Sequence, residues 1–396
     1  MPKKKCRYGR SCYRKNDQHL RDYDHGSGSE SGDEVTATEP DSLPEPPKKK
    51  SKITEFFKSQ DDKVKEVEVE ESADICQVEE DSIAAPASPA DVKENIKSKF
   101  GVEMPEDFYE FWQFAESLNK KNPTDALKKE LGLQLVGPFD ILAGKKSSLK
   151  KPCWFRHWRY YYDPPEFLTI LRGNDDTQFH MGYFRDDPKE MPVFVASNEA
   201  KVNCNIVPRG ENIFAAVIWF IEDAIRKSKS NKSTLNNLKS KVEKWASKCD
   251  FLTAPGKSKA MKARDKKSVC ATFHGAGLVV PVDEHGVGYR EVPETTADLK
   301  KMLKNIVVAK DVESRNKATD PLMEIVMLVQ FANDECDYGE GLELGLCMFS
   351  FGGECLHKMI LNLMPLAYQL LKRNLYADCI KAHLEDRKHS TDLSQL

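Results

Sequence analysis

The sequence lacks the glycine-rich signatures with which many enzymes hold nucleotide phosphates. It contains no G-x-G-x-x-G pattern, and residues 137–147 miss the P-loop spacing because their final Gly-Lys pair is followed by a second lysine. The G-x-S-x-G nucleophile elbow is also absent. These absences argue against a kinase, an NTPase or a Rossmann enzyme.

Long apolar runs and regularly spaced cysteines are missing as well. No apolar run reaches the roughly 18 residues that a membrane-spanning helix needs, so we expect no membrane partner. The 11 cysteines are odd in number and unevenly spaced, and no apolar leader opens the chain. We therefore expect a reducing compartment.

The composition is typical of a globular protein with polar extensions. The chain has 396 residues, of which 40% are hydrophobic and 31% charged, and this length favours two domains and a tail. Its net charge of −3 conceals segregation: residues 226–267 contain 14 Lys or Arg and 3 acids, whereas residues 61–81 contain 10 acids and 2 Lys. A basic block can contact a polyanion, although a solvated helix face is the commoner explanation.

The start of the chain contains four side chains that suit a zinc ion. Cys6, Cys12, His19 and His25 are separated by five, six and five residues. Two thiolates and two imidazoles form a tetrahedral zinc set, and so short a segment cannot bury a core, so we expect zinc to fold it. The alternative is a disordered basic tail with incidental cysteines. The spacing disfavours the DNA-reading finger, whose cysteines are about two to four residues apart.

The side chains between these ligands suit a polymer of phosphates and purines. Tyr8 and Tyr13 offer flat faces for stacking, and arginines such as Arg14 can pair with phosphates. The segment resembles the poly(ADP-ribose)-binding zinc finger family at residues 6–9, 12–14 and 16–19. The resemblance implies that Tyr8, Tyr13 and Arg14 bind poly(ADP-ribose).

Residues 27–89 are rich in Ser, Glu, Asp and Pro and poor in aromatic residues, so we expect a disordered linker. Its basic run at 47–52 resembles a nuclear localisation signal. Ile53, Phe56 and Phe57 follow at the spacing of one helical face. They resemble the peptide box that binds the replication sliding clamp, although that box normally opens with glutamine. The alternative is that they pack on the chain's own folded body.

The rest of the sequence predicts an α+β fold followed by a mostly helical part. Helices are expected from about residue 91, after Pro105, and over 213–226, 322–331, 356–376 and 377–387, and strands over 133–136, 167–171, 179–184 and 193–195. Short connections between the strands indicate an antiparallel sheet. We therefore divide the chain into a small CCHH zinc finger (1–26), a disordered linker (27–89), an antiparallel-sheet α+β domain (90–255) and a mostly α domain (256–396).

Two histidines and one acidic cluster are the places where the folded part could carry chemistry. His157 lies among aromatic residues, and His274 lies in a glycine-containing loop. A buried histidine with satisfied hydrogen bonds is more common than a catalytic one, so we expect both to be structural. The acidic cluster, residues 333–339, is different because of where it falls.

Three carboxylates follow an apolar helix at its C-terminal end. They belong to Asp334, Glu335 and Asp337, and both the helix dipole and their mutual repulsion disfavour them there. Crowding of this kind raises the proton affinity of a carboxylate, as a general base requires. The alternative is a loop whose acids bond to turn amides, with Gly339 and Gly341 closing the turn.

Several long blocks resemble the histone PARylation factor family. In order, they are residues 105–109, 131–138, 161–167, 180–185, 273–281 and 331–339. The resemblance extends from about residue 90 to the C-terminus. Proteins of that family dock on a DNA-damage-activated poly(ADP-ribose) polymerase and complete a joint active site, which redirects modification from Asp and Glu to Ser.

The resemblance also implies roles for individual residues. Glu335 is the implied general base, Asp334 supports the interface, and Tyr289 and Arg290 lie on the docking surface. NAD would enter only through the partner polymerase, and we expect no independent enzyme activity. Histones are the implied substrates, and chromatin at sites of DNA damage in the nucleus is the implied location. Glu354 is a departure, because a relative carries histidine there.

Two other functions stay open on the sequence. The chain could be a non-catalytic poly(ADP-ribose) reader that scaffolds repair proteins, with the acidic cluster merely structural. It could also be a self-sufficient ADP-ribosyl hydrolase or transferase that uses Glu335 alone. The first would leave the amino acid that a polymerase modifies unchanged, and the second would act with no polymerase present.

Overall fold

The computed structural model describes residues 3–5, 23–24, 89–145, 147, 152–228, 230–253 and 256–396. The chain divides into two compact units, Met1–Asp81 and Ser82–Leu396. Of the first unit, only strands β1 (Lys4–Lys5) and β2 (Tyr23–Asp24) are described, and they pair in parallel. The predicted linker lies outside the described residues, and so do the predicted zinc ligands, polymer contacts and clamp-box residues, Cys6, Cys12, His19, His25, Tyr8, Tyr13, Arg14, Ile53, Phe56 and Phe57.

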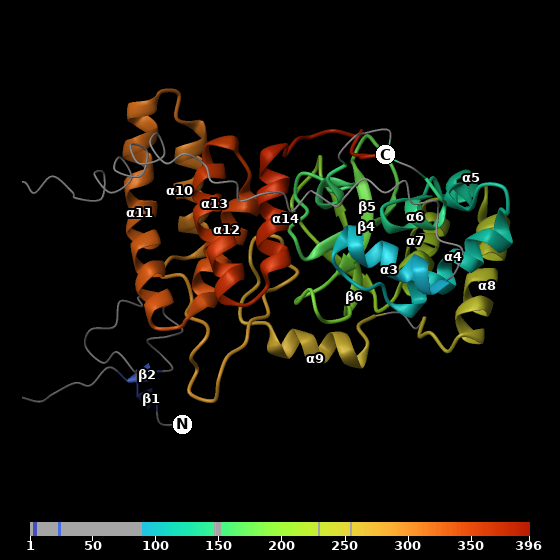
Figure 1. Ribbon diagram of the computed structural model, residues 1–396, viewed down its shortest axis with the longest axis horizontal. Helices are drawn as coiled ribbons and strands as arrows, with labels where there is room; N and C mark the ends of the chain where they lie inside the picture. The colour runs from blue at the N-terminus through green and yellow to red at the C-terminus, as the bar shows by residue number, and fades with distance from the viewer. Residues whose placement is uncertain are drawn as a thin grey trace, which may run out of the picture. The chain divides into compact units, whose positions relative to one another are not determined.

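The second unit contains the predicted antiparallel sheet (Figure 1). Five strands pair in sequence order, β3 (Gln134–Leu135), β4 (Phe167–Arg172), β5 (Phe179–Phe184), β6 (Phe194–Glu199) and β7 (Val207–Gly210). The first four confirm the predicted strands. Strand β7 was not predicted, because its sequence Val-Pro-Arg-Gly lacks alternating apolar residues; proline is tolerated there because β7 is an edge strand.

One face of the sheet is covered by helices, which are α3 (Pro89–Phe100), α4 (Glu106–Leu118), α6 (Pro138–Leu142) and α7 (Ile213–Lys227). Helix α8 (Lys232–Lys248) packs against α7. Helix α4 begins after Pro105, as predicted, and its three phenylalanines, Phe108, Phe111 and Phe114, are buried in the core with Phe214 of α7. Buried Asp107 accepts hydrogen bonds from the Tyr183 hydroxyl (2.7 Å) and the Ile213 amide (2.8 Å). This carboxylate ties α4 to β5 and to the first turn of α7. The short helix α5 (Lys128–Leu131) precedes β3.

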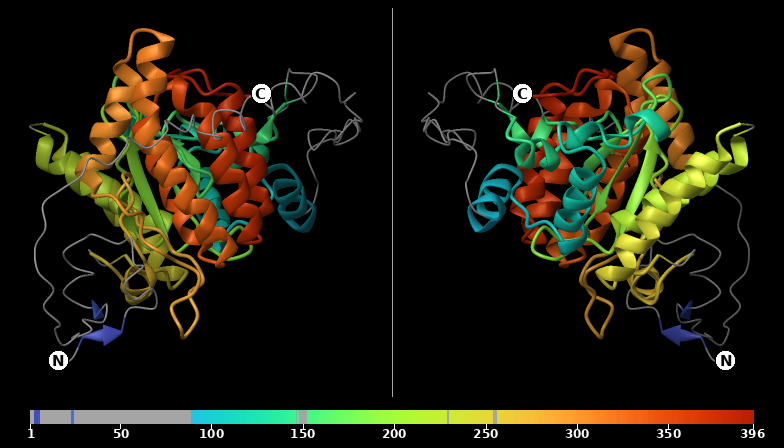
Figure 2. Two further views of the ribbon diagram at one scale, coloured as in Figure 1. Left: turned by 90° about the vertical axis from the view of Figure 1, so that its left-hand side faces the viewer. Right: turned by 90° about the vertical axis from the view of Figure 1, so that its right-hand side faces the viewer.

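The predicted helical part follows, and its helices gather on the side of the unit opposite to α3–α8 (Figures 1 and 2). They are α10 (Thr296–Val308), α11 (Val312–Asp334), α12 (Tyr338–Phe351), α13 (His357–Leu370) and α14 (Asn374–Glu385). The predicted apolar positions of α11 are buried, which confirms that interpretation. Helix α13 ends earlier than predicted, before Lys372, whose φ of 60° is incompatible with a continuing helix. No helix among the described residues is long and apolar enough to cross a membrane.

Helix α12 corrects the interpretation of Gly339 and Gly341 as turn glycines, because both lie inside the helix. The sequence pattern did not predict this helix, because glycine disfavours helices. Packing explains its glycines. A Cβ on Gly345 would lie 2.3 Å from Cγ of Met364, so the absence of a side chain lets α12 and α13 approach closely.

Glu166 joins the sheet side to the helical side. Its carboxylate is 5% exposed and accepts a 2.8 Å hydrogen bond from the Tyr368 hydroxyl of α13. Burial raises the pKa of Glu166 to about 7. The folded protein therefore keeps a proton on this carboxyl at a pH where the unfolded chain has released it.

We predict that Glu166→Gln makes stability less sensitive to pH. The wild-type free energy of unfolding should fall as pH rises from about 4.5, the ordinary pKa, to about 7, because the folded state binds more protons over this window. The glutamine variant should therefore exceed wild type by up to about 3 kcal/mol at pH 8 and match it near pH 4. Urea unfolding across this range measures the difference, and a difference that is the same at every pH would contradict the prediction.

Candidate active site at the end of helix α11

The acidic cluster is built on a sharp reversal between α11 and α12. Helix α11 ends at Asp334, and the Asp337 amide bonds back to the Ala332 carbonyl (2.8 Å) while the Cys336 amide bonds to Asn333 (3.1 Å). This pair of bonds is a Schellman motif, with Cys336 in the left-handed position at φ 65°. The reversal leaves the side chains of Asp334, Glu335 and Cys336 exposed and that of Asp337 buried.

A buried arginine connects two of the three carboxylates. Arg290 is 2% exposed, and its Nη2 donates to Oδ2 of Asp337 (2.9 Å) and to Oε2 of Glu335. The second carboxylate oxygen of Asp337 accepts from the Gly288 amide (3.0 Å). The cluster is therefore not a group of mutually repelling acids, as the sequence alone indicated. Glu335 combines a fixed position with a side chain that is 41% exposed.

Glycines let the segment that carries Arg290 lie against α12. The Gly339 amide donates to the Gly288 carbonyl (2.9 Å), and a Cβ on Gly339 would lie 2.9 Å from Cδ2 of Tyr289. Gly288 has a φ of +126°, which favours glycine. The Tyr289 hydroxyl donates to Glu343 of α12 (2.9 Å), whose pKa is raised by burial. These contacts position Arg290 beside the acidic cluster.

The structure thus brings Glu335, Asp334, Tyr289 and Arg290 together, although they are far apart in the sequence. Sequence reasoning missed the contribution of Asp337, which holds Arg290 from the buried side; its position before a new helix would have been the signal. It also missed the exposure of Phe331, one turn before Glu335. This side chain is 53% exposed and adds an apolar surface next to the carboxylate.

Both candidate histidines have structural roles, as predicted. His157 is buried; its Nε2 lies 3.0 Å from Oδ2 of Asp140, and its Nδ1 accepts from the Gln395 amide (3.0 Å). His274 is 1% exposed, its Nδ1 accepts from the Ala276 amide, and burial lowers its pKa to about 3. Buried rings that make these bonds are suited to support the fold.

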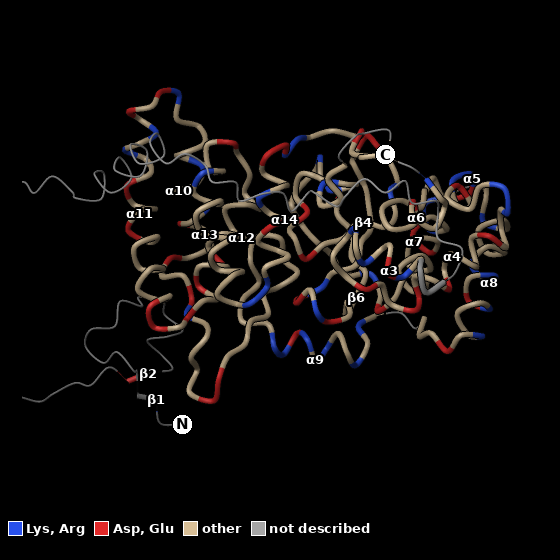
Figure 3. Tube along the Cα trace, viewed as in Figure 1, with Lys and Arg blue, Asp and Glu red and all other residues tan. Residues whose placement is uncertain are grey.

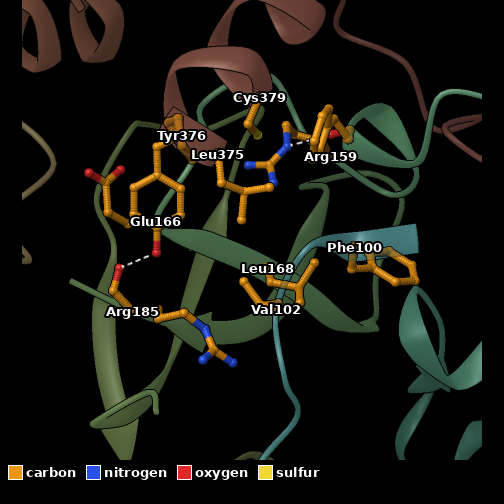
Figure 4. A pocket seen from close by; sticks show the side chains of 11 residues that line it. Phe100, Val102, Arg159, Glu166, Leu168, Arg185, Leu375, Tyr376 and Cys379 are labelled. Carbon is orange, nitrogen blue, oxygen red and sulfur yellow. Dashed lines mark hydrogen bonds between the residues drawn. The ribbon is translucent and has the colours of Figure 1, made fainter. Parts of the chain in front are cut away.

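A pocket in the described part of the chain lies away from the acidic cluster (Figure 4). It is lined by residues of α3, β4 and α14 and by the neighbourhood of Glu166. Its two arginines donate to backbone carbonyls, Arg159 to Pro164 (2.7 Å) and Arg185 to Glu103 (2.7 Å). Neither Asp334 nor Glu335 lines it. The carboxylates instead face outward, where another protein can reach them.

Most of the chain matches a known protein family. Residues 91–387 match the family model described as histone PARylation factor 1. The chain belongs to the histone PARylation factor family. Relatives named histone PARylation factor 1 from Mus musculus and Bos taurus are each 50% identical to it, over 75% and 78% of this chain and 87% and 90% of their own lengths. A human relative, named putative histone PARylation factor 1-like, is 47% identical over 76% of this chain and 87% of its own.

The N-terminal segment has a match of its own. Residues 3–28 match the family model described as PBZ domain, which confirms the resemblance of this segment to the poly(ADP-ribose)-binding zinc finger. Cys6, Cys12, His19 and His25 are a donor set that fits tetrahedral zinc, and all four fall within the match. Those four residues lie outside the ranges that the structure describes, and within these ranges no group of three or more His, Cys, Asp or Glu side chains could hold a metal ion.

We predict that Arg290 stabilises the fold much more than Glu335 does. Arg290→Ala leaves Asp337, whose side chain is 5% exposed, without its cation, and should lower the free energy of unfolding by roughly 3–5 kcal/mol. Glu335→Gln alters a partly exposed pair and should change it by less than about 1 kcal/mol. Urea denaturation of both variants makes the comparison. Similar losses of unfolding free energy in the two variants would show that the buried Asp337 carboxylate does not need Arg290 as its cation.

Proposed function

We propose that this chain docks on a DNA-damage-activated poly(ADP-ribose) polymerase and completes its active site for serine ADP-ribosylation of histones and other proteins. The observation that carries the proposal is an outward-facing carboxylate, Glu335, which a buried arginine holds in place. The names of its relatives, which refer to histone PARylation, support the same class of activity.

In this proposal Glu335 acts as the general base. A serine hydroxyl is a poor nucleophile near neutral pH, whereas the carboxylates of Asp and Glu are already ionised and attack without help. Glu335 accepts the hydroxyl proton as the serine oxygen bonds to the ribose carbon of NAD, and the bond from that carbon to nicotinamide breaks. The partner polymerase binds NAD. A base supplied in this way favours serine selectively.

The residues around Glu335 have supporting roles. Arg290 positions the Glu335 carboxylate from the buried side, and Tyr289 holds the segment that contains Arg290 in place by its hydrogen bond to Glu343. Asp334 and Phe331 are both exposed in the last turn of α11 and are available to the partner, one by charge and one by apolar contact. Because Arg290 is buried, its share in docking is to fix the surface that the partner meets.

The finger adds a second attachment. We propose that Tyr8, Tyr13 and Arg14 of the zinc-bound finger bind poly(ADP-ribose) already made at a lesion, in the nucleus and on damaged chromatin. A tether between finger and body raises the effective concentration of Glu335 near active polymerase. Ile53, Phe56 and Phe57 would bind the sliding clamp, which a pull-down of residues 45–62 with a Phe56→Ala/Phe57→Ala control can test.

A non-catalytic poly(ADP-ribose) reader is the second candidate, favoured by the PBZ match alone. It predicts that the body leaves the modified amino acid unchanged. A self-sufficient hydrolase or transferase is a third, which labelled NAD or polymer incubated with the chain alone would reveal.

We predict that Glu335→Gln abolishes serine modification of histone peptides while leaving polymerase binding within about twofold, because it removes a base and changes no shape. Mass spectrometry of peptides modified by polymerase, NAD and each variant measures the outcome. Glu324→Gln, also exposed on α11, is the matched control and should retain full activity. Serine modification by the Glu335 variant at the control's rate would refute the assignment.

We predict that Cys6→Ser separates the two attachments. Loss of one thiolate should release zinc and weaken poly(ADP-ribose) binding at least tenfold, about 1.4 kcal/mol, because the finger has no core of its own. Serine transfer in a purified mixture should continue at an unchanged rate. Zinc content and polymer affinity are measured on the full chain, with Cys249→Ser as a control. Retained zinc would contradict the ligand set, and lost transfer would show that the finger takes part in the chemistry.

A further inference from the structure

Helix α9 (Lys259–Lys267) is a surface helix with an unusually small buried face. Of its 9 residues, only Met261 and Arg264 are buried. Met261 packs on the sheet face opposite to α4, with Phe184 and Phe194. The Ser258 side chain caps the helix by accepting from the Met261 amide (3.1 Å). One apolar side chain supplies little hydrophobic stabilisation. The other residues of the helix therefore contribute little to the core.

Arg264 fixes the orientation of the helix. Its guanidinium forms a two-bond pair with Asp186 (2.7 and 2.9 Å) and also donates to the Gly277 carbonyl (3.0 Å). Pairs of this geometry are specific as well as strong. Arg264 therefore holds α9 between the end of β5 and the loop around residue 277, and the opposite face of the helix must point to solvent.

That outer face carries a line of lysines. Lys259, Lys262 and Lys266 are all exposed. At about 100° per residue they fall within roughly 60° of one another, on the side opposite to Met261 and Arg264. They span about 10 Å along the helix axis, a length that corresponds to about three phosphates of one DNA strand.

Within the described part of the chain, these charges have no carboxylate partner. Asp265, the acidic residue of α9, lies off the lysine face and pairs with Lys257 (2.6 Å). None of Lys259, Lys262 and Lys266 contacts a carboxylate among the described residues. By contrast, Lys239 of α8 pairs with both Glu222 and Glu243. Figure 3 shows the basic positions recurring along α9 at the outer edge of the unit.

We propose that the lysine face of α9 binds the phosphate backbone of duplex DNA. Three cations that have no carboxylate partner among the described residues match a regular row of phosphates, and the small side chain of Ala263 beside them lets a backbone approach. The exposed residues of α9 include no aromatic side chain, so the face offers nothing on which unstacked bases could stack. The contact is therefore to a double strand, without sequence preference.

This surface is separate from the acidic cluster and does not depend on the role of Glu335. Its position is nevertheless useful, because Arg264 fastens α9 to the loop that leads toward Tyr289 and Arg290. A lesion that activates the partner polymerase also presents duplex DNA. Contact with that duplex through α9 would retain the chain near a break before any poly(ADP-ribose) is made.

The test compares DNA affinities of full-length variants by fluorescence anisotropy with a labelled blunt duplex. Replacing Lys259, Lys262 and Lys266 together by alanine keeps the helix, since alanine favours it. The triple variant should bind the duplex about tenfold more weakly or worse, and the slope of log affinity against log salt should fall by about 2–3. The same three positions changed to arginine should retain wild-type affinity.

The control replaces three other exposed lysines, Lys120, Lys301 and Lys304, by alanine and so removes the same charge. It should keep most of the duplex affinity and the salt slope. An equal loss in the control would show that net charge alone matters and would overturn the proposal. A triple variant that loses poly(ADP-ribose) binding but keeps duplex binding would overturn it too, in favour of the polymer. Unchanged binding to different duplex sequences would support backbone contact.

Discussion

The ion pairs of the buried Arg290 side chain determine how the acidic cluster is arranged. A guanidinium that is 2% exposed cannot stay in the protein without carboxylate partners, because the cost of removing it from water is several kcal/mol. Asp337 and Glu335 supply those partners, and the turn at Cys336 brings both to one side of the helix ends. The turn, the two helix ends and the loop with Gly288 are therefore coupled through a single side chain.

The glycines of α12 make that coupling possible. Gly339 allows the segment containing Tyr289 to lie in van der Waals contact with the first turn of the helix, and Gly345 allows the same helix to lie against α13. Each glycine costs about 1 kcal/mol of helix propensity relative to alanine. The close contacts on both sides of α12 offset that cost, and they place Arg290 within hydrogen-bonding distance of Asp337.

Much of the fold followed from local pattern, whereas the site required tertiary contacts. Strand β5 has the predicted bounds because a short run of strand-forming residues is bounded by turn residues, and α4 begins where Pro105 indicated. Helix α12 was missed because its glycines are explained only by what packs against them. The pairing of Arg290 with residues about 45 positions away is likewise invisible to local pattern. Glu335 itself was identified through family resemblance together with its position at a helix end.

The two-carboxylate arrangement also explains how one residue can be both fixed and available. Glu335 is partly exposed, and in the mechanism that we propose it turns toward a substrate hydroxyl supplied by another protein. When it does so, Arg290 keeps its 2.9 Å contact with Asp337 and is not left as an unpaired buried charge, which would cost several kcal/mol. If Glu335 were the sole partner of Arg290, movement of its carboxylate would leave a buried charge unpaired, and that cost would hold the carboxylate in place. The buried carboxylate therefore stabilises the arginine, so the proton transfer that we propose for Glu335 would not leave Arg290 without an anionic partner.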